Sequence, residues 1–138
     1  MNKSLENAVK TLKSKPSYSG IFHLLEQYKD TVAGETITKE GALKQYTYSD
    51  YADKSYACCG KLQALSQFRK GEIIGLIYET CIEWPALFWG VLMAGGIPLL
   101  GNSTINRTSQ AEIIKEANAY AYIAEKPLKD CAVPMIDA

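Results

Sequence analysis

The sequence predicts an α/β fold of three layers, in which a mostly parallel sheet is flanked by helices. Short apolar runs recur at residues 73–77, 97–100 and 119–124, each bounded by glycine or polar residues. The segments between these runs carry apolar residues at helical spacing. Strands that alternate with helices in this way form βαβ units with right-handed crossovers.

Residues 1–18 are predicted to be an N-terminal tail or a short helix, and residues 19–138 to be one partial subdomain. Leu5, Val9 and Leu12 have helical spacing, and Pro16 ends that pattern. A clearer helix follows, with Ser19 as a candidate N-cap. The only histidine, His23, lies in this helix, and the sequence offers no second group that would make it catalytic.

A β-hairpin is predicted next, from residues 35–38 and 44–48 around the turn Lys39-Glu40-Gly41. Thr47 and Asp50 then have the spacing of an approximate capping box, which predicts the start of a long helix. One face of that helix should be buried, and its members would be Tyr51, Ser55, Cys58 or Cys59, Leu62 and Leu65.

The central stretch predicts a strand over residues 73–77, a buried helix over 84–94 and a second strand from Ile97. The helix has two candidate starts, because Thr80 to Glu83 matches a capping box while Pro85 suits a first helical position. We expect a loose first turn from Thr80 that tightens after Pro85.

The same stretch has no charged residue from Trp84 through Asn106, which is long enough to span a bilayer. Two prolines and two adjacent glycines within it argue against one continuous helix, so we expect no membrane span.

A further helix is predicted over residues 108–118, with Thr108 or Ser109 as its cap. Ile113, Ile114 and Ala117 should face inward. A third strand is expected over residues 119–124, and residues 133–136 are a candidate fourth strand.

Composition excludes several kinds of partner. The 138 residues carry 15 basic and 15 acidic side chains, so no overall charge attracts nucleic acid. The four cysteines lack metal-site spacing, and we expect no metal site. No apolar signal segment opens the chain, and the expected location is therefore the cytoplasm, where these thiols stay reduced.

The expected binding edge of the sheet lies at the carboxyl ends of its strands. Two loops follow strands there, residues 78–82 and 101–105, and they contribute the candidate pocket-lining residues Thr80, Asn102, Ser103 and Thr104. The same four residues suit helix capping and turn formation. No catalytic residue is assigned, because no nucleophile, base and orienting group occur together.

Five motifs in order resemble the N-terminal region of the AMP-forming acyl-adenylating superfamily, which includes acyl-CoA and aryl-CoA synthetases. They are Tyr46-Thr47-Tyr48-Ser49-Asp50-Tyr51, Leu62, Lys70-Gly71-Glu72-Ile73-Ile74, Glu83-Trp84-Pro85-Ala86-Leu87-Phe88 and Ala94-Gly95-Gly96. Residues 109–125 resemble the next helix and strand of that family. Leu99-Leu100-Gly101-Asn102-Ser103 departs from the proline-containing turn of many relatives.

The resemblance implies an incomplete N-terminal subdomain of an acyl-CoA synthetase-like ligase. Such enzymes activate a carboxylic or fatty acid with ATP and magnesium, and then pass the acyl group to coenzyme A or another thiol. The motifs for those steps lie later in the family's chains and have no match here. The resemblance therefore implies that the fragment alone is inactive and that its partner is the remainder of the parent enzyme.

Two further expectations stay open at this point. An incomplete sheet would leave an edge strand and apolar surface uncovered, so we expect the fragment to self-associate. The alternative to the ligase is a free-standing flavodoxin-like binding or interaction module, which needs no missing part.

Overall fold

The fold is that of a computed structural model, which describes residues 3–14, 18–79 and 81–137. The chain forms two compact units, Met1–Asp53 and Lys54–Ala138.

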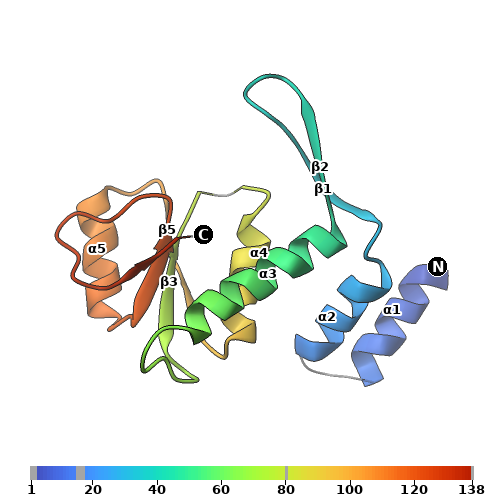
Figure 1. Ribbon diagram of the computed structural model, residues 1–138, viewed down its shortest axis with the longest axis horizontal. Helices are drawn as coiled ribbons and strands as arrows, with labels where there is room; N and C mark the ends of the chain where they lie inside the picture. Colours follow the sequence, from blue (N-terminus) through green and yellow to red (C-terminus); the bar gives the residue numbers. More distant parts are fainter. Residues whose placement is uncertain (1–2, 15–17, 80, 138) are drawn as a thin grey trace. The chain divides into compact units, whose positions relative to one another are not determined.

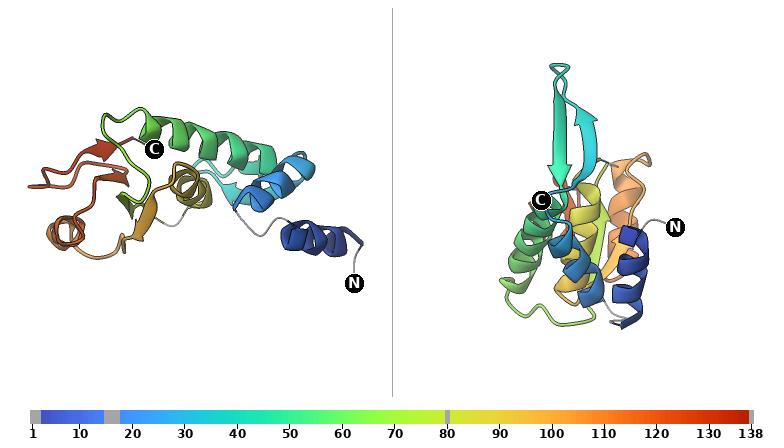
Figure 2. Two further views of the ribbon diagram at one scale, coloured as in Figure 1. Left: turned by 90° about the horizontal axis from the view of Figure 1, so that it is seen from below. Right: turned by 90° about the vertical axis from the view of Figure 1, so that its right-hand side faces the viewer.

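The first unit contains helices α1 (Lys3–Ser14) and α2 (Tyr18–Gln27), and a hairpin of strands β1 (Val32–Ile37) and β2 (Leu43–Thr47). The strands pair antiparallel as the sequence predicts, although β1 begins earlier, at Val32 (Figure 2). Gly41 has a φ of 82°, which explains why glycine occupies the predicted turn. Of the two predictions for the N-terminus, the short helix is the one observed.

Helix α3 (Tyr48–Gln63) begins with the predicted capping box. The Thr47 hydroxyl accepts from the Asp50 backbone N–H at 3.2 Å, and the Asp50 carboxylate accepts from the Thr47 N–H at 2.7 Å. Of the two adjacent cysteines, Cys58 is the buried one, and Cys59 is half-buried. The buried face also includes Ser55 and Leu62, both with no exposed surface.

The second unit is built on a four-stranded sheet in the order β4-β3-β5-β6. Its strands are β3 (Ile73–Ile77), β4 (Ile97–Leu100), β5 (Ala121–Ala124) and β6 (Met135–Ile136). Every pairing is parallel, which confirms the predicted sheet and the candidate fourth strand. Strand β5 begins at Ala121, two residues after the predicted start at Ala119.

Helices cover both faces of this sheet, which confirms the three-layer prediction (Figure 1). On one face lie α4 (Trp84–Met93) and the second half of α3, and on the other lies α5 (Arg107–Glu116). The α4 side buries a core that includes Leu62, Leu76, Val91 and Ile123. The α5 side buries a separate core that includes Ile114 and Tyr122.

Two details, both in α5, differ from the sequence prediction. Helix α4 begins at Trp84, after a turn in which the Trp84 N–H bonds to the Cys81 carbonyl oxygen, and it has Pro85 in its first turn, where the missing N–H costs least. A loose first turn from Thr80 stays a prediction. Thr80 lies outside the described residues. The cap of α5 is Asn106, whose side chain accepts from the Ser109 N–H, and not Thr108 or Ser109. The buried residues of α5 are Gln110, Ala111 and Ile114, so Ile113 lies beside the buried face and is 37% exposed, while Ile114 is fully buried.

Gly95 ends α4 with a φ of 85°, and Gly96 packs against Val91, so this pair turns the chain tightly into β4. Among the described residues, no helix is both long and apolar enough to cross a membrane.

Candidate functional site

The candidate site is the edge of the sheet at which β3, β4 and β5 end. From β3 the chain crosses by α4 to a neighbour on one side, and α5 then returns it to β5 on the other side. The loops after β3 and β5 therefore diverge at a topological switch point. Open α/β sheets bind ligands at such a point, outside the carboxyl ends of the strands.

The loop after β4 holds three of the predicted pocket residues, and its contacts are those of a rigid turn. The Asn102 side-chain oxygen accepts from the Thr104 backbone N–H at 2.8 Å and from the Thr104 hydroxyl at 2.7 Å. Ser103 is partly buried, while Asn102 and Thr104 are exposed. A pocket-lining role for these residues stays a prediction, as does one for Thr80.

Gln110 fixes this loop, and sequence reasoning missed it. The side chain is 4% exposed and belongs to α5. Its amide nitrogen lies 3.2 Å from the carbonyl oxygen of Asn102, 3.3 Å from that of Ser103 and 3.1 Å from that of Ile105. The only signal in the sequence was a glutamine next to the inward-facing positions of a predicted helix, shortly after a polar loop.

The loop after β5 is held in a similar way. Tyr122 is buried in β5, and its hydroxyl accepts from the Leu128 N–H at 2.9 Å. Arg107, at the start of α5, donates to the carbonyl oxygens of Lys126 at 3.3 Å and Pro127 at 3.0 Å. Both loops thus have defined shapes before any ligand binds.

The loop after β3 contributes two titratable groups to the edge, Tyr78 and Cys81. Burial, together with the charges of Glu125 and Glu83, raises the pKa of the Tyr78 phenol. Burial also raises the pKa of Cys81, against the opposite effect of hydrogen bonds from the backbone of Glu83 and Trp84, and the Glu83 carboxylate adds to the rise. Tyr78 and Cys81 therefore stay protonated at neutral pH, as hydrogen-bond donors.

The start of α4 does not suit the phosphates of ATP, which need free backbone N–H groups. In α4 the N–H of Trp84 bonds to Cys81, those of Ala86 and Leu87 bond to Glu83, and Pro85 has none. In α5 the Asn106 side chain already accepts from the Ser109 N–H. Within the described ranges no group of three or more His, Cys, Asp or Glu side chains is placed to hold a metal ion.

The thiols do not form an activated nucleophile either. Burial, together with the neighbouring Cys59, raises the pKa of Cys58 to about 11, and burial also raises the pKa of Cys59. A reactive cysteine needs the opposite shift, toward the thiolate. The edge is thus a shaped scaffold with protonated donors at Tyr78 and Cys81.

Comparisons with known proteins show the family to which this chain belongs. The family of AMP-binding enzymes matches residues 23–137, and the chain therefore belongs to that family. No curated protein matches the chain.

Several solved structures are similar to this chain in fold. The N-terminal subdomain of NpsA from Klebsiella oxytoca, in complex with 3-hydroxybenzoyl-AMSN, has a TM-score of 0.67 and 21% identity, over 85% of this chain and 29% of that one. A benzoate CoA ligase from Burkholderia xenovorans has a TM-score of 0.65 and 23% identity, over 78% of this chain and 21% of that one. An artificial NpsA-ThdA fusion from Klebsiella oxytoca, a didomain of an adenylation domain and a PCP, has a TM-score of 0.72 and 19% identity, over 88% of this chain and 24% of that one. The chain thus spans less than a third of the length of each.

Proposed function

We propose that this chain is the N-terminal part of an ATP-dependent, AMP-forming acid–thiol ligase. The parent enzyme would activate a carboxylic or fatty acid as its acyl-adenylate and pass the acyl group to coenzyme A. The observation that carries this proposal is the match of the AMP-binding enzyme family to residues 23–137. A ligase whose named activity includes coenzyme A, from Burkholderia xenovorans, supports the choice of acceptor.

In this proposal the remainder of the parent polypeptide holds ATP, magnesium and coenzyme A, and supplies the catalytic residues. The occupied start of α4, after Glu83, supports that division, because it offers a triphosphate few free N–H groups. The present chain contributes the scaffold, with its loops held by Gln110 and Tyr122. Alone, it is expected to be inactive.

The decisive experiment combines the gene with two assays. The reading frame beyond codon 138 should continue into a Ser/Thr/Gly-rich phosphate loop, and that longer protein should catalyse acid-dependent exchange of pyrophosphate into ATP. Calorimetry of the 138-residue chain with ATP and magnesium should give no saturable heat. A longer protein without acid-dependent exchange would contradict the ligase, and exchange by the short chain would contradict its inactivity.

The parallel order β4-β3-β5-β6 also favours a second candidate, a flavodoxin-like module. A stop codon directly after residue 138 would support this module over the ligase.

For the isolated chain we also propose self-association through the edge strand β4. Ile97 and Leu100 lie on this edge and are 53% and 55% exposed. Sedimentation velocity should show a concentration-dependent oligomer that Ile97→Lys weakens. A monomer at all concentrations would contradict this proposal.

A further inference from the structure

Helix α1 (Lys3–Ser14) has an apolar patch on its exposed surface. Leu5, Val9 and Leu12 recur along this helix at the spacing of one helical face. In the structure Val9 is 39% exposed and Leu12 is 38% exposed. Residues three positions apart are neighbours on a helix surface, so Val9 and Leu12 form one apolar patch and not two isolated contacts.

The patch is offset from the side of α1 that packs against α2. The two helices are in contact. Among the positions of α1 whose burial is described, Ala8 and Thr11 are the least exposed, which marks the side that faces α2. Each residue advances by about 100° around a helix axis, so the centre of the patch lies roughly 100° from the centre of that contact. The contact with α2 therefore leaves the patch open.

Lysines dominate the charge around the patch. Residues 3–15 contain one acidic residue, Glu6, and four lysines, which are Lys3, Lys10, Lys13 and Lys15. This segment therefore has a net charge of +3, although the formal net charge of the whole chain is +0. Lys13 borders the patch, roughly 70° around the helix axis from its centre.

These lysines are not engaged within the described part of the chain. Lys10 and Lys13 are exposed, and neither has a hydrogen bond or an ion pair with a described residue. A negatively charged partner would therefore not have to break an existing contact. An apolar patch beside such ammonium groups is typical of a helix that lies in the interface of an anionic bilayer.

The packing of α1 favours a flat partner over a groove. A helix that lies on a bilayer needs only one open side, and α1 keeps α2 on another side. A protein groove that encloses a helix would have to displace α2. The helix is also too short to cross a bilayer, because its 12 residues extend over about 18 Å and a hydrocarbon core is about 30 Å thick.

We propose that α1 binds the surface of an anionic lipid bilayer, with Val9 and Leu12 between the headgroups and Lys13 on the lipid phosphates. The other lysines of the segment add attraction over a longer range. Two large apolar side chains give weak and reversible attachment. The helix thus positions the protein at a membrane surface, and it would do so whether or not the parent protein is a ligase.

The test measures cosedimentation of the chain with vesicles of phosphatidylcholine, either pure or mixed with phosphatidylserine. We expect binding to the mixed vesicles only, and weaker binding as the salt concentration rises, because salt screens the attraction between lysines and lipids. Amide hydrogen exchange should slow in α1 when mixed vesicles are added and should stay the same in the second unit. No binding, equal binding to both kinds of vesicle, or unchanged exchange in α1 would each overturn the proposal.

One pair of variants tests the apolar patch. Leu12→Gln should weaken binding to the mixed vesicles about tenfold, because a leucine side chain no longer enters the interface. Ile113→Gln is the matched control, since Ile113 lies on α5 and is 37% exposed, close to the 38% of Leu12. It should bind like the wild type. Glutamine suits a helix, so circular dichroism should show the same helix content in both variants. Wild-type binding by Leu12→Gln would overturn the proposal, because charge alone would then explain the attachment.

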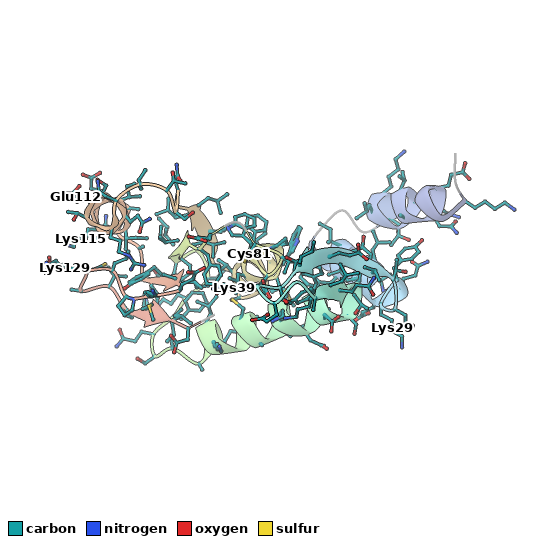
Figure 3. The ribbon with its side chains drawn as sticks, turned by 90° about the horizontal axis from the view of Figure 1, so that it is seen from above. Lys29, Lys39, Cys81, Glu112, Lys115 and Lys129 are labelled. Atoms are coloured by element: carbon teal, nitrogen blue, oxygen red, sulfur yellow. The ribbon has the colours of Figure 1, made fainter. Side chains whose placement is uncertain are left out.

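A second pair tests the position of the charge. Lys10→Gln with Lys13→Gln should weaken binding at least about fivefold, since one lysine near an anionic surface contributes about that factor. Lys115→Gln with Lys129→Gln removes the same charge from the second unit, where both lysines are exposed (Figure 3), and should leave binding unchanged. Equal weakening in the two double variants would overturn the proposal, because binding would then follow the net charge of the chain and not α1.

Discussion

Cys58 and Gly90 pack so closely that no side chain fits between α3 and α4 at their crossing. A Cβ atom added to Gly90 would lie 2.5 Å from the Cβ atom of Cys58 and 2.9 Å from the backbone oxygen of Ser55. One of these neighbours is backbone, so the helices would have to move apart to make room. This contact sets the distance between the two helices that cover one face of the sheet.

Gly90→Ala should therefore destabilise the protein although alanine favours helices. Overpacking of a close helix contact costs about 1–3 kcal/mol. The free energy of unfolding in urea measures this cost. Gly60→Ala is the matched control, since a Cβ atom there meets nothing within 4 Å. That control should be neutral or stabilising by up to about 1 kcal/mol. Equal effects in the two variants would contradict the packing argument.

Gln110→Leu should loosen the loop after β4. The substitution leaves the carbonyl oxygens of Asn102, Ser103 and Ile105 without the amide that binds them. Buried groups that lose a partner cost about 1–3 kcal/mol. Amide hydrogen exchange should become faster at Thr104, whose N–H bonds to Asn102.

The control for this prediction is Glu112→Leu, on the exposed side of the same helix. It should leave exchange at Thr104 unchanged. Unchanged exchange in Gln110→Leu as well would show that the loop is held by its own turn contacts.

Asp50→Ala should weaken the start of α3 by about 1 kcal/mol, the usual cost of losing a capping interaction. The variant removes the carboxylate that accepts from the Thr47 N–H and hydroxyl. Asp53→Ala removes the same charge from the exposed side of the same helix and should cost less. Thermal unfolding, followed by circular dichroism, measures the stability of both variants. An equal loss of stability in the two would show that the effect comes from the charge alone.

Local patterns in the sequence were enough to predict most of the elements. The Thr47–Asp50 pair predicted the start of α3, and the turn at Gly41 predicted the hairpin, because both depend on neighbouring residues. The parallel sheet followed from the alternation of strands with helices. The cap of α5 was wrong by two or three residues, since Asn106, Thr108 and Ser109 are all good capping residues and only the exit angle of the loop selects one.

Features that depend on contacts far apart in the sequence could not be predicted in this way. The order β4-β3-β5-β6 requires knowing on which side of β3 each crossover packs. The loop-binding role of Gln110 and the close contact of Gly90 with Cys58 each depend on a second element whose position the sequence does not state.

The stability of the protein should fall as the pH rises from about 9 to about 11, and Cys58 should account for much of the fall. Burial, together with Cys59, raises the pKa of Cys58 from 9.0 to about 11, while Lys61 acts in the opposite direction. In this window the unfolded chain loses the thiol proton and the folded chain keeps it. Folding therefore retains a proton that unfolding releases, and alkaline conditions favour the unfolded state.

The size of the effect is about 2–3 kcal/mol, since one unit of pKa corresponds to about 1.4 kcal/mol. Urea unfolding of wild type and Cys58→Ala between pH 8 and pH 11.5, roughly the window around these two values, measures it. The variant should start less stable, because its core loses a sulfur atom, but should lose less with rising pH. Tyr78, Cys59 and Cys81 also have raised pKa values, so the pH dependence of stability should shrink in the variant and not vanish.

The control is Cys131→Ala, which removes a half-buried thiol on the other side of the sheet. If both variants keep the slope of the wild type, the buried thiol of Cys58 is not its source.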